Sequence, residues 1–334
     1  MRLPPLPDGQ NAAGAPAPAA PAPVTPAPVT PAPVTHVTIR ASDLPLEKIE
    51  APQALALIRR TIGPAYRPVG AAMVFAVDGG FTGNLSSGCI DADIALHARK
   101  VIASGTALDL RYGDGSPFRD LELPCGGGLD IRILPLTGAQ GFEALRRRIL
   151  AREPADLWVG PDRLSTRAFR GADLHLRINP DIRFVTFGKG PEAVAFARMT
   201  AGAGYETFLS SPDEETLALA GRDGIRNLPF PHHGARRADL PTDRHTAVTL
   251  FFHDHDLEPE ILAQALRTEA FYIGAQGSRR TAERRAERLH ALGVDAAALQ
   301  RLRGPMGIIP STRDARTLAA SVLTEILAES LAID

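Results

Sequence analysis

Short apolar segments alternate with helical segments from residue 181 to the end of the chain. Strands followed in this way by helices form parallel sheets, because each crossover between parallel strands is a helix. The pattern therefore predicts a Rossmann-like, doubly wound parallel sheet over residues 181–334. Its strands are expected at residues 182–187, 205–209, 246–252 and 270–273, and its helices at residues 191–202, 258–266, 279–292 and 312–328.

The preceding part of the chain has shorter strands and more glycine turns, which is typical of an α+β domain. We predict this N-terminal domain over residues 46–140, with one helix at residues 52–62 and a second directly after Cys89. Strands are expected at residues 71–77, 81–84, 107–112, 121–124 and 129–134. Residues 141–180 are interpreted as a connector that has strands of its own. This segment contains a predicted helix at residues 142–151 and the single tryptophan, Trp158.

Proline dominates the start of the chain. Three copies of Pro-Ala-Pro-Val-Thr fill residues 21–35. Proline removes backbone donors and favours polyproline II, and a stretch of this composition cannot bury enough apolar surface to offset the entropy lost on ordering. We predict a disordered tail over residues 1–45, which serves as a spacer or as a ligand for a proline-recognising module.

The charges of the chain balance, with 37 Lys plus Arg against 38 Asp plus Glu. This balance gives no reason to expect a nucleic acid or an anionic membrane as partner. No apolar run approaches the roughly 20 residues that span a bilayer, and the start lacks a signal-peptide core. The expected location is the cytoplasm.

Both cysteines lie in glycine-rich turns. Cys125 precedes Gly126 and Gly127, which allow positive φ and the close approach of a ligand. Cys89 follows Gly88 and precedes a predicted helix, whose N-terminus favours the thiolate. These five residues are candidate ligand-binding residues. The alternative interpretation is that the two cysteines are unrelated thiols that happen to lie in tight turns.

The segment Gly188-Lys-Gly190-Pro-Glu-Ala has the glycine spacing of a dinucleotide fingerprint between a strand and a helix. Glycines at these positions form a tight turn, and the amides of a helix N-terminus can hold a phosphate. Glu192 opposes a nicotinamide cofactor, because its charge would repel a pyrophosphate. Gly188 and Gly190 are therefore candidate cofactor-binding residues, although NAD(P) is not the expected cofactor.

A second glycine turn, Gly274-Ala-Gln-Gly277-Ser278-Arg279-Arg280, ends in two cations. Backbone amides, a hydroxyl and guanidinium groups suit a phosphate-bearing ligand, and a simple helix cap is the alternative. The later arginines of this helix, Arg284, Arg285 and Arg288, are expected on a solvated face.

Polar residues also follow the third predicted strand of the C-terminal half. His253 and His255 are weak candidates for metal ligands, against the plainer interpretation of a polar loop. We find no Ser-His-Asp set and no carboxylate pair that would predict a catalytic residue.

Several of these motifs together resemble the XdhC/CoxI family, the accessory factors of xanthine dehydrogenase and related molybdenum hydroxylases. The similar segments are Leu-Ser-Ser-Gly-Cys-Ile-Asp-Ala at residues 85–92, Arg-Tyr-Gly at 111–113 and Leu-Pro-Cys-Gly-Gly-Gly at 123–128. Tyr-Ile-Gly-Ala-Gln-Gly-Ser-Arg-Arg at residues 272–280 and Gly-Pro-Met-Gly at 304–307 are similar to the family's C-terminal domain. The resemblance covers roughly residues 49–327, and Ser87 stands where many relatives have glycine.

The resemblance implies a cytoplasmic chaperone and not an enzyme. Such a chaperone binds molybdenum cofactor (molybdopterin), protects it while an oxo ligand is exchanged for sulfur, and delivers it to an apo molybdenum hydroxylase. Its implied partners are that hydroxylase and a cysteine desulfurase or similar sulfur donor, and a homodimer is left open. Two alternatives remain at this point: an NAD(P)-dependent oxidoreductase that uses the Gly188 turn, and a thiol- or metal-dependent enzyme.

Overall fold

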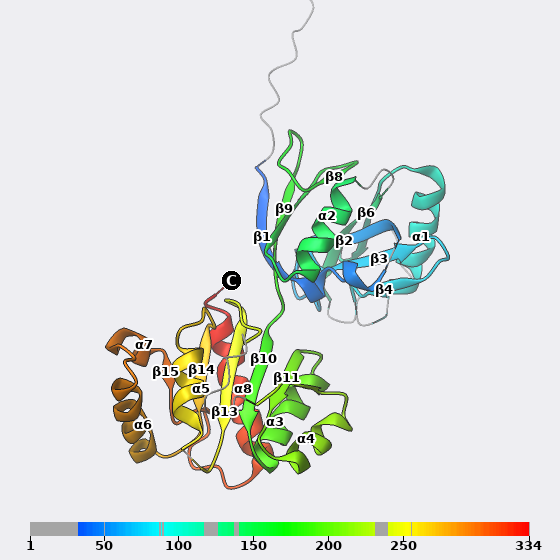
Figure 1. The fold of residues 1–334 in the computed structure, drawn as a ribbon. Helices are drawn as coiled ribbons and strands as arrows, with labels where there is room; N and C mark the ends of the chain where they lie inside the picture. The colour runs from blue at the N-terminus through cyan, green and yellow to red at the C-terminus, as the bar shows by residue number, and fades with distance from the viewer. Residues whose placement is uncertain are drawn as a thin grey trace, which may run out of the picture. The chain divides into compact units, whose positions relative to one another are not determined.

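The structure is a computed structural model that describes residues 33–333, apart from residues 50, 87, 89, 117–125, 137–139, 231–239 and 255. Within these limits the chain folds into an N-terminal lobe, residues 34–180, and a C-terminal lobe, residues 183–333 (Figure 1). No helix among these residues combines the length and apolar character that a membrane span requires.

A five-stranded antiparallel sheet forms the centre of the N-terminal lobe, in the order β4-β3-β2-β6-β5. Its strands are β2 (Pro52–Ile62), β3 (Ala72–Ala76), β4 (Phe81–Gly83), β5 (Leu108–Gly113) and β6 (Gly128–Pro135). Helix α1 (Asp91–Ser104) packs on one face through Ile94, Ala98 and Val101. The predicted helix after Cys89 and the predicted strands near residues 71–77, 81–84, 107–112 and 129–134 are thus confirmed, and the strand predicted at residues 121–124 lies outside the described residues.

The helix predicted at residues 52–62 is wrong, because this segment is the central strand β2. Leu55 and Leu57 point into the hydrophobic cluster on one face of the sheet, and Ala54, Ala56 and Ile58 point into the cluster on the other. A strand that is buried on both faces shows no alternation of apolar and polar residues. Its continuous apolar run therefore resembles a buried helix.

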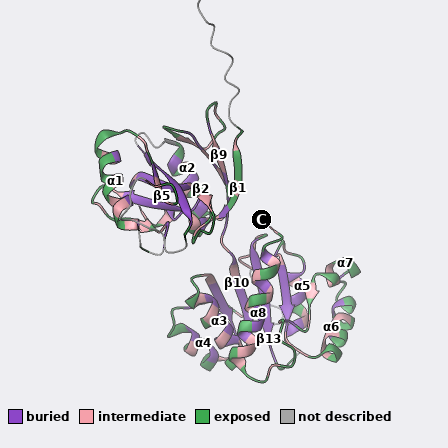
Figure 2. Ribbon diagram, turned by 180° about the vertical axis from the view of Figure 1, so that it is seen from behind, coloured by how far each residue is buried: buried purple, intermediate pink, exposed green. Residues whose placement is uncertain are grey.

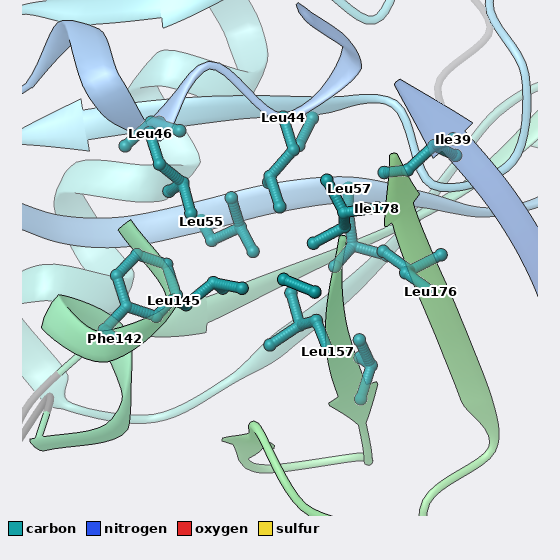
Figure 3. Close-up of a cluster of buried hydrophobic side chains, with 14 of the residues drawn as sticks. Ile39, Leu44, Leu46, Leu55, Leu57, Phe142, Leu145, Leu157, Leu176 and Ile178 are labelled. Atoms are coloured by element: carbon teal, nitrogen blue, oxygen red, sulfur yellow. The ribbon is translucent and has the colours of Figure 1, made fainter. Parts of the chain in front are cut away.

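A second sheet covers the other face, in the order β1-β9-β7-β8. It is formed by β1 (Thr35–Arg40), β7 (Ala155–Val159), β8 (Leu164–Ser165) and β9 (Leu174–Asn179). Together with α2 (Gln140–Leu150) and the short 3-10 helices Ala41–Asp43 and Leu46–Lys48, it buries the leucine-rich cluster of Figure 3 against β2.

This second sheet corrects two predictions about the N-terminal half. The disordered tail was expected to reach residue 45, but residues 35–40 form β1, which pairs in parallel with β9. Residues 141–180 were expected to be a connector, but they supply β7, β8 and β9 and share one core with the preceding domain. The helix predicted at residues 142–151 is confirmed as α2.

The C-terminal lobe is a six-stranded sheet in the order β12-β11-β10-β13-β14-β15, and all its neighbouring strands are parallel. The strands are β10 (Arg183–Gly188), β11 (Glu206–Ser210), β12 (Arg226–Asn227), β13 (Thr246–Phe251), β14 (Tyr272–Ala275) and β15 (Leu302–Arg303). The predicted doubly wound sheet is therefore confirmed, with β12 and β15 as edge strands that the sequence did not predict.

Helices cover both faces of this parallel sheet (Figure 2). One face of the sheet packs against apolar residues of α3 (Pro191–Gly202), α4 (Glu214–Gly221) and α8 (Ala315–Ser330). The other face packs against apolar residues of α5 (Glu258–Ala265) and α6 (Arg279–Ala291). The short helix α7 (Ala296–Gln300) lies beside α6. From the central pair β10 and β13, the chain winds outward in opposite directions. In such sheets the ligand site lies at this switch of direction, beyond the carboxyl ends of the strands.

Candidate functional site at the carboxyl edge of the parallel sheet

Three loops leave the carboxyl ends of β10, β13 and β14, next to the point where the strand order reverses. They contain the Gly188–Gly190 turn, the segment around His253 and the Gln276–Ser278 turn. The structure therefore brings together most of the candidate residues that the sequence places in the C-terminal half.

The turn after β10 needs both of its glycines. A side chain at Gly188 would lie 2.7 Å from the Cβ of Ala193 and from the carbonyl oxygen of Phe251, so only glycine fits between α3 and β13. Gly190 has a φ of 88°, in the region that favours glycine, and it caps α3. Its amide donates to the hydroxyl of Thr216 at 3.0 Å, and that hydroxyl donates to Asp213 at 2.6 Å. One amide that a phosphate would use is thus already engaged within the protein.

A carboxylate stands at the same helix N-terminus. Glu192 lies in the first turn of α3, with one oxygen 3.4 Å from Nε2 of His253. Its other oxygen is buried and has no hydrogen-bond partner. A negative charge here benefits from the helix dipole and repels a second anion. The turn has the shape of a dinucleotide fingerprint, but its charge opposes a pyrophosphate.

The turn after β14 has a different character. Gly277 adopts a φ of 142°, and a side chain at Gly274 would lie 2.6 Å from the ring of Tyr272. Ser278 caps α6 by accepting a hydrogen bond from the Thr281 amide at 3.2 Å. Arg279 and Arg280 follow as exposed residues of the first helical turn. Two guanidinium groups therefore stand at a helix N-terminus, where side chains and backbone both favour an anion.

Arg285 is buried, which corrects its expected place on a solvated face. It donates two hydrogen bonds to Glu258, at 2.8 and 3.2 Å, and a third to the carbonyl oxygen of Gln276 at 2.6 Å. Because Gln276 belongs to the glycine turn, this ion pair fixes the turn to α5. Thr281, Arg285 and Leu289 are spaced four residues apart and share one helix face, which is the signal in the sequence that could have placed Arg285 inside.

A cavity of about 280 Å³ opens beside this ion pair. Its lining carries charges of both signs, including Asp254, Asp256, Arg284 and Arg288. Arg288 is held by Asp256 at 2.6 Å, whereas Arg284 is exposed. Arg284, which follows Arg279 and Arg280 on α6, is therefore a further exposed cation, and it lines this cavity.

The expectation of a metal at His253 and His255 gains no support. No group of three or more His, Cys, Asp and Glu is placed to hold an ion within the part of the chain that the structure describes. His253 faces Glu192, and His255 lies outside the described residues.

Of the candidates in the N-terminal lobe, Cys89 and Cys125 lie outside the described residues, while their glycine neighbours are described. Gly88 and Gly126 have φ values of 100° and 68°, and a side chain on either would meet open space. At Gly127 a side chain would lie 2.0 Å from the carbonyl oxygen of Pro64, so this glycine is needed for chain packing. Gly126 therefore adopts the positive φ that was expected beside Cys125, and Gly88 has a positive φ as well.

Comparison with known proteins agrees with this architecture. The XdhC and CoxI family model matches residues 49–113, and the XdhC Rossmann domain model matches residues 184–326. The chain belongs to the XdhC/CoxI family.

Among individual relatives, the molybdenum cofactor insertion chaperone PaoD of Escherichia coli (strain K12) is 36% identical over 272 residues, which are 79% of this chain and 79% of that protein. A crystal structure described as a xanthine dehydrogenase from Bacillus halodurans has the same fold. It matches with a TM-score of 0.66 at 20% identity, over 88% of this chain and 96% of that chain.

Proposed function

We propose that this protein binds molybdenum cofactor in the cytoplasm, supports its sulfuration and delivers it to an apo molybdenum hydroxylase of the xanthine dehydrogenase type. The observation that carries the proposal is the 36% identity, over 79% of both chains, with a molybdenum cofactor insertion chaperone. The cofactor is the cargo of such a protein and supplies the redox-active molybdenum that the client enzyme uses.

The site at α6 supports this proposal because molybdopterin carries a phosphate. Ser278, Arg279 and Arg280 offer a hydroxyl and two guanidinium groups to that phosphate, at a helix N-terminus. Neither arginine has an ion-pair partner among the described residues. Gly274 and Gly277 shape the turn, and the buried pair of Arg285 and Glu258 holds it in place.

We assign contact with the molybdenum end of the cofactor to the thiols of Cys125 and Cys89. Thiolate is a soft ligand that suits a metal–sulfur centre. A side chain added at Gly88 or at Gly126 would meet open space, so packing does not close off either of these two positions. A sulfur donor such as a cysteine desulfurase is the partner that sulfuration needs.

An NAD(P)-dependent oxidoreductase is the alternative that the Gly188 turn suggested. Two observations count against it: the carboxylate of Glu192 at the helix N-terminus, and the engagement of the Gly190 amide by Thr216. The glycine geometry of this turn is the one feature that suits a dinucleotide, and the charge at the helix N-terminus opposes it.

Equilibrium binding of isolated molybdopterin, measured by ultrafiltration, tests the role of α6. The double variant Arg279→Gln/Arg280→Gln should bind more weakly by about 1.5–3 kcal/mol per lost charge-assisted hydrogen bond, which is roughly 10- to 150-fold. The difference should shrink as salt is raised. The matched control is Arg147→Gln/Arg148→Gln, an adjacent exposed pair on α2 that changes the net charge equally. Equal affinity of both double variants and the parent at low salt would remove the α6 turn from the binding site.

A further inference from the structure

Two imidazoles meet on the outer face of the four-stranded sheet, outside the site proposed above. His36 on β1 and His175 on β9 are partners in the register of these parallel strands. Their Nδ1 atoms lie 2.9 Å apart. Residues that alternate with them, such as Val37, Leu174 and Leu176, belong to the core, so the histidines project from the opposite face.

The environment fixes the ring of His175. Its Nε2 lies 3.0 Å from Oδ1 of Asp156, and the ring stacks on Trp158 with the centroids 4.2 Å apart. A carboxylate accepts hydrogen bonds, so Nε2 of His175 carries the proton. The lone pair of a neutral His175 is then on Nδ1, directed at His36. A carboxylate that orients a histidine in this way is the usual outer partner of a metal-bound imidazole.

We propose that His36 and His175 form a binding site for a divalent late first-row transition metal, with copper(II) bound most tightly. Each histidine supplies Nδ1, water completes the coordination, and Asp156 orients His175. In the metal-free protein the two rings share a hydrogen bond. The ion replaces that bond, and His36 then holds its proton on Nε2, so no net proton is released.

The separation of the nitrogen atoms favours this class of ion. Two metal–nitrogen bonds of about 2.0–2.1 Å that meet at 90° place the nitrogens about 2.9 Å apart, whereas a tetrahedral angle places them about 3.4 Å apart. The hydrogen bond of the metal-free pair already holds the two nitrogens 2.9 Å apart, which is close to the separation that the tetragonal geometry of copper(II) and nickel(II) requires, so these ions need little movement of the two rings. Affinity for a nitrogen site also rises from nickel to copper and falls again to zinc. No third His, Cys, Asp or Glu joins the pair among the residues described, so two protein ligands are assigned.

The single tryptophan reports directly on this site. Trp158 stacks on His175 and also has an edge contact with His36, with the centroids 6.0 Å apart. Copper(II) bound between the imidazoles should quench the fluorescence of Trp158. The titration uses the full chain with both thiols changed, Cys89→Ser/Cys125→Ser, so that cysteine cannot bind the ion.

One equivalent of copper(II) should quench Trp158 saturably, and electron paramagnetic resonance should show a tetragonal ion with nitrogen ligands. His36→Gln and His175→Gln should each weaken binding at least tenfold. Asp156→Asn should weaken it about 10- to 100-fold through the orientation of His175. The control His290→Gln, an exposed histidine on α6, should titrate like the parent.

The proposal is overturned if the parent shows no saturable quenching, or if His36→Gln and the control titrate alike. His36 is exposed and lies on an edge strand, so its substitution should preserve the fold, and an unchanged thermal midpoint verifies this. The metal site does not depend on the binding of molybdenum cofactor. If one of these two proposals fails its test, the other is unaffected.

Discussion

Substitution of Glu258 by leucine should destabilise the C-terminal lobe strongly. Glu258 and Arg285 are 0% and 3% exposed, and their side chains form a bidentate ion pair. Leucine removes the carboxylate and leaves the guanidinium of Arg285 buried without its counter-charge. Loss of one partner of a buried pair lowers the free energy of unfolding by about 3–5 kcal/mol.

The structure also predicts where in this range the effect falls. Arg285 keeps its hydrogen bond to the carbonyl oxygen of Gln276, at 2.6 Å, so one of its three bonds survives the substitution. We therefore expect a loss near the lower end, about 3 kcal/mol. The double variant Glu258→Leu/Arg285→Met buries no charge, and hydrophobic replacement of such a pair is often neutral. Its remaining loss is the unpaired Gln276 carbonyl, about 1–3 kcal/mol.

Urea unfolding followed by far-ultraviolet circular dichroism measures both variants. The expected order of stability is the parent, then the double variant, then Glu258→Leu. The reasoning is refuted if Glu258→Leu unfolds within about 1 kcal/mol of the parent, since that loss is typical of an exposed pair. It is also refuted if the second substitution makes the protein less stable than Glu258→Leu alone.

Three further predictions concern the choice of cofactor, stability in acid and thiol reactivity. Titration with NADH, followed by fluorescence, should give no saturable binding in the low micromolar range because Glu192 occupies the helix N-terminus; saturable binding would favour the oxidoreductase. A hydrogen bond from Arg111 holds the pKa of Asp130 below its ordinary value. The ionised carboxylate of Asp130 therefore stabilises the folded protein above about pH 4, and this stabilisation is lost as the pH falls further. Thermal midpoints from pH 6 to 2 should therefore fall less steeply for Asp130→Asn than for the parent, and parallel curves would contradict this. Cys89 should react with iodoacetamide with an apparent pKa below about 8.5, and a profile centred at that value would exclude activation by α1.

The alternation of strands and helices was sufficient to predict the C-terminal sheet, because each strand and crossover carries its own local signal. The two-residue edge strands β12 and β15 were missed, since segments so short have no periodicity. In the N-terminal lobe β2 was predicted as a helix for the opposite reason. It is long and contains a continuous apolar run at residues 54–58, and only its neighbours on both faces decide that it is a strand.

Contacts between residues far apart in sequence explain what the site analysis missed. The conformations of Gly190 and Gly277 could be predicted from their turns. The burial of Arg285 depends on Glu258, 27 residues earlier, and the shared helix face with Leu289 was the only local hint of it in an arginine-rich helix. Strand β1 adjoins the proline repeats and pairs with β9, about 140 residues later, so the local composition suggested a tail.

Molybdenum and pterin content of the protein purified from a molybdenum-replete host tests the central proposal most directly. The parent should co-purify with molybdenum and an oxidisable, fluorescent pterin in a fixed ratio. Cys125→Ala should lose most of the molybdenum while its thermal midpoint stays within a few degrees of the parent. A parent that carries neither molybdenum nor pterin, and that takes up no isolated cofactor, would contradict the account.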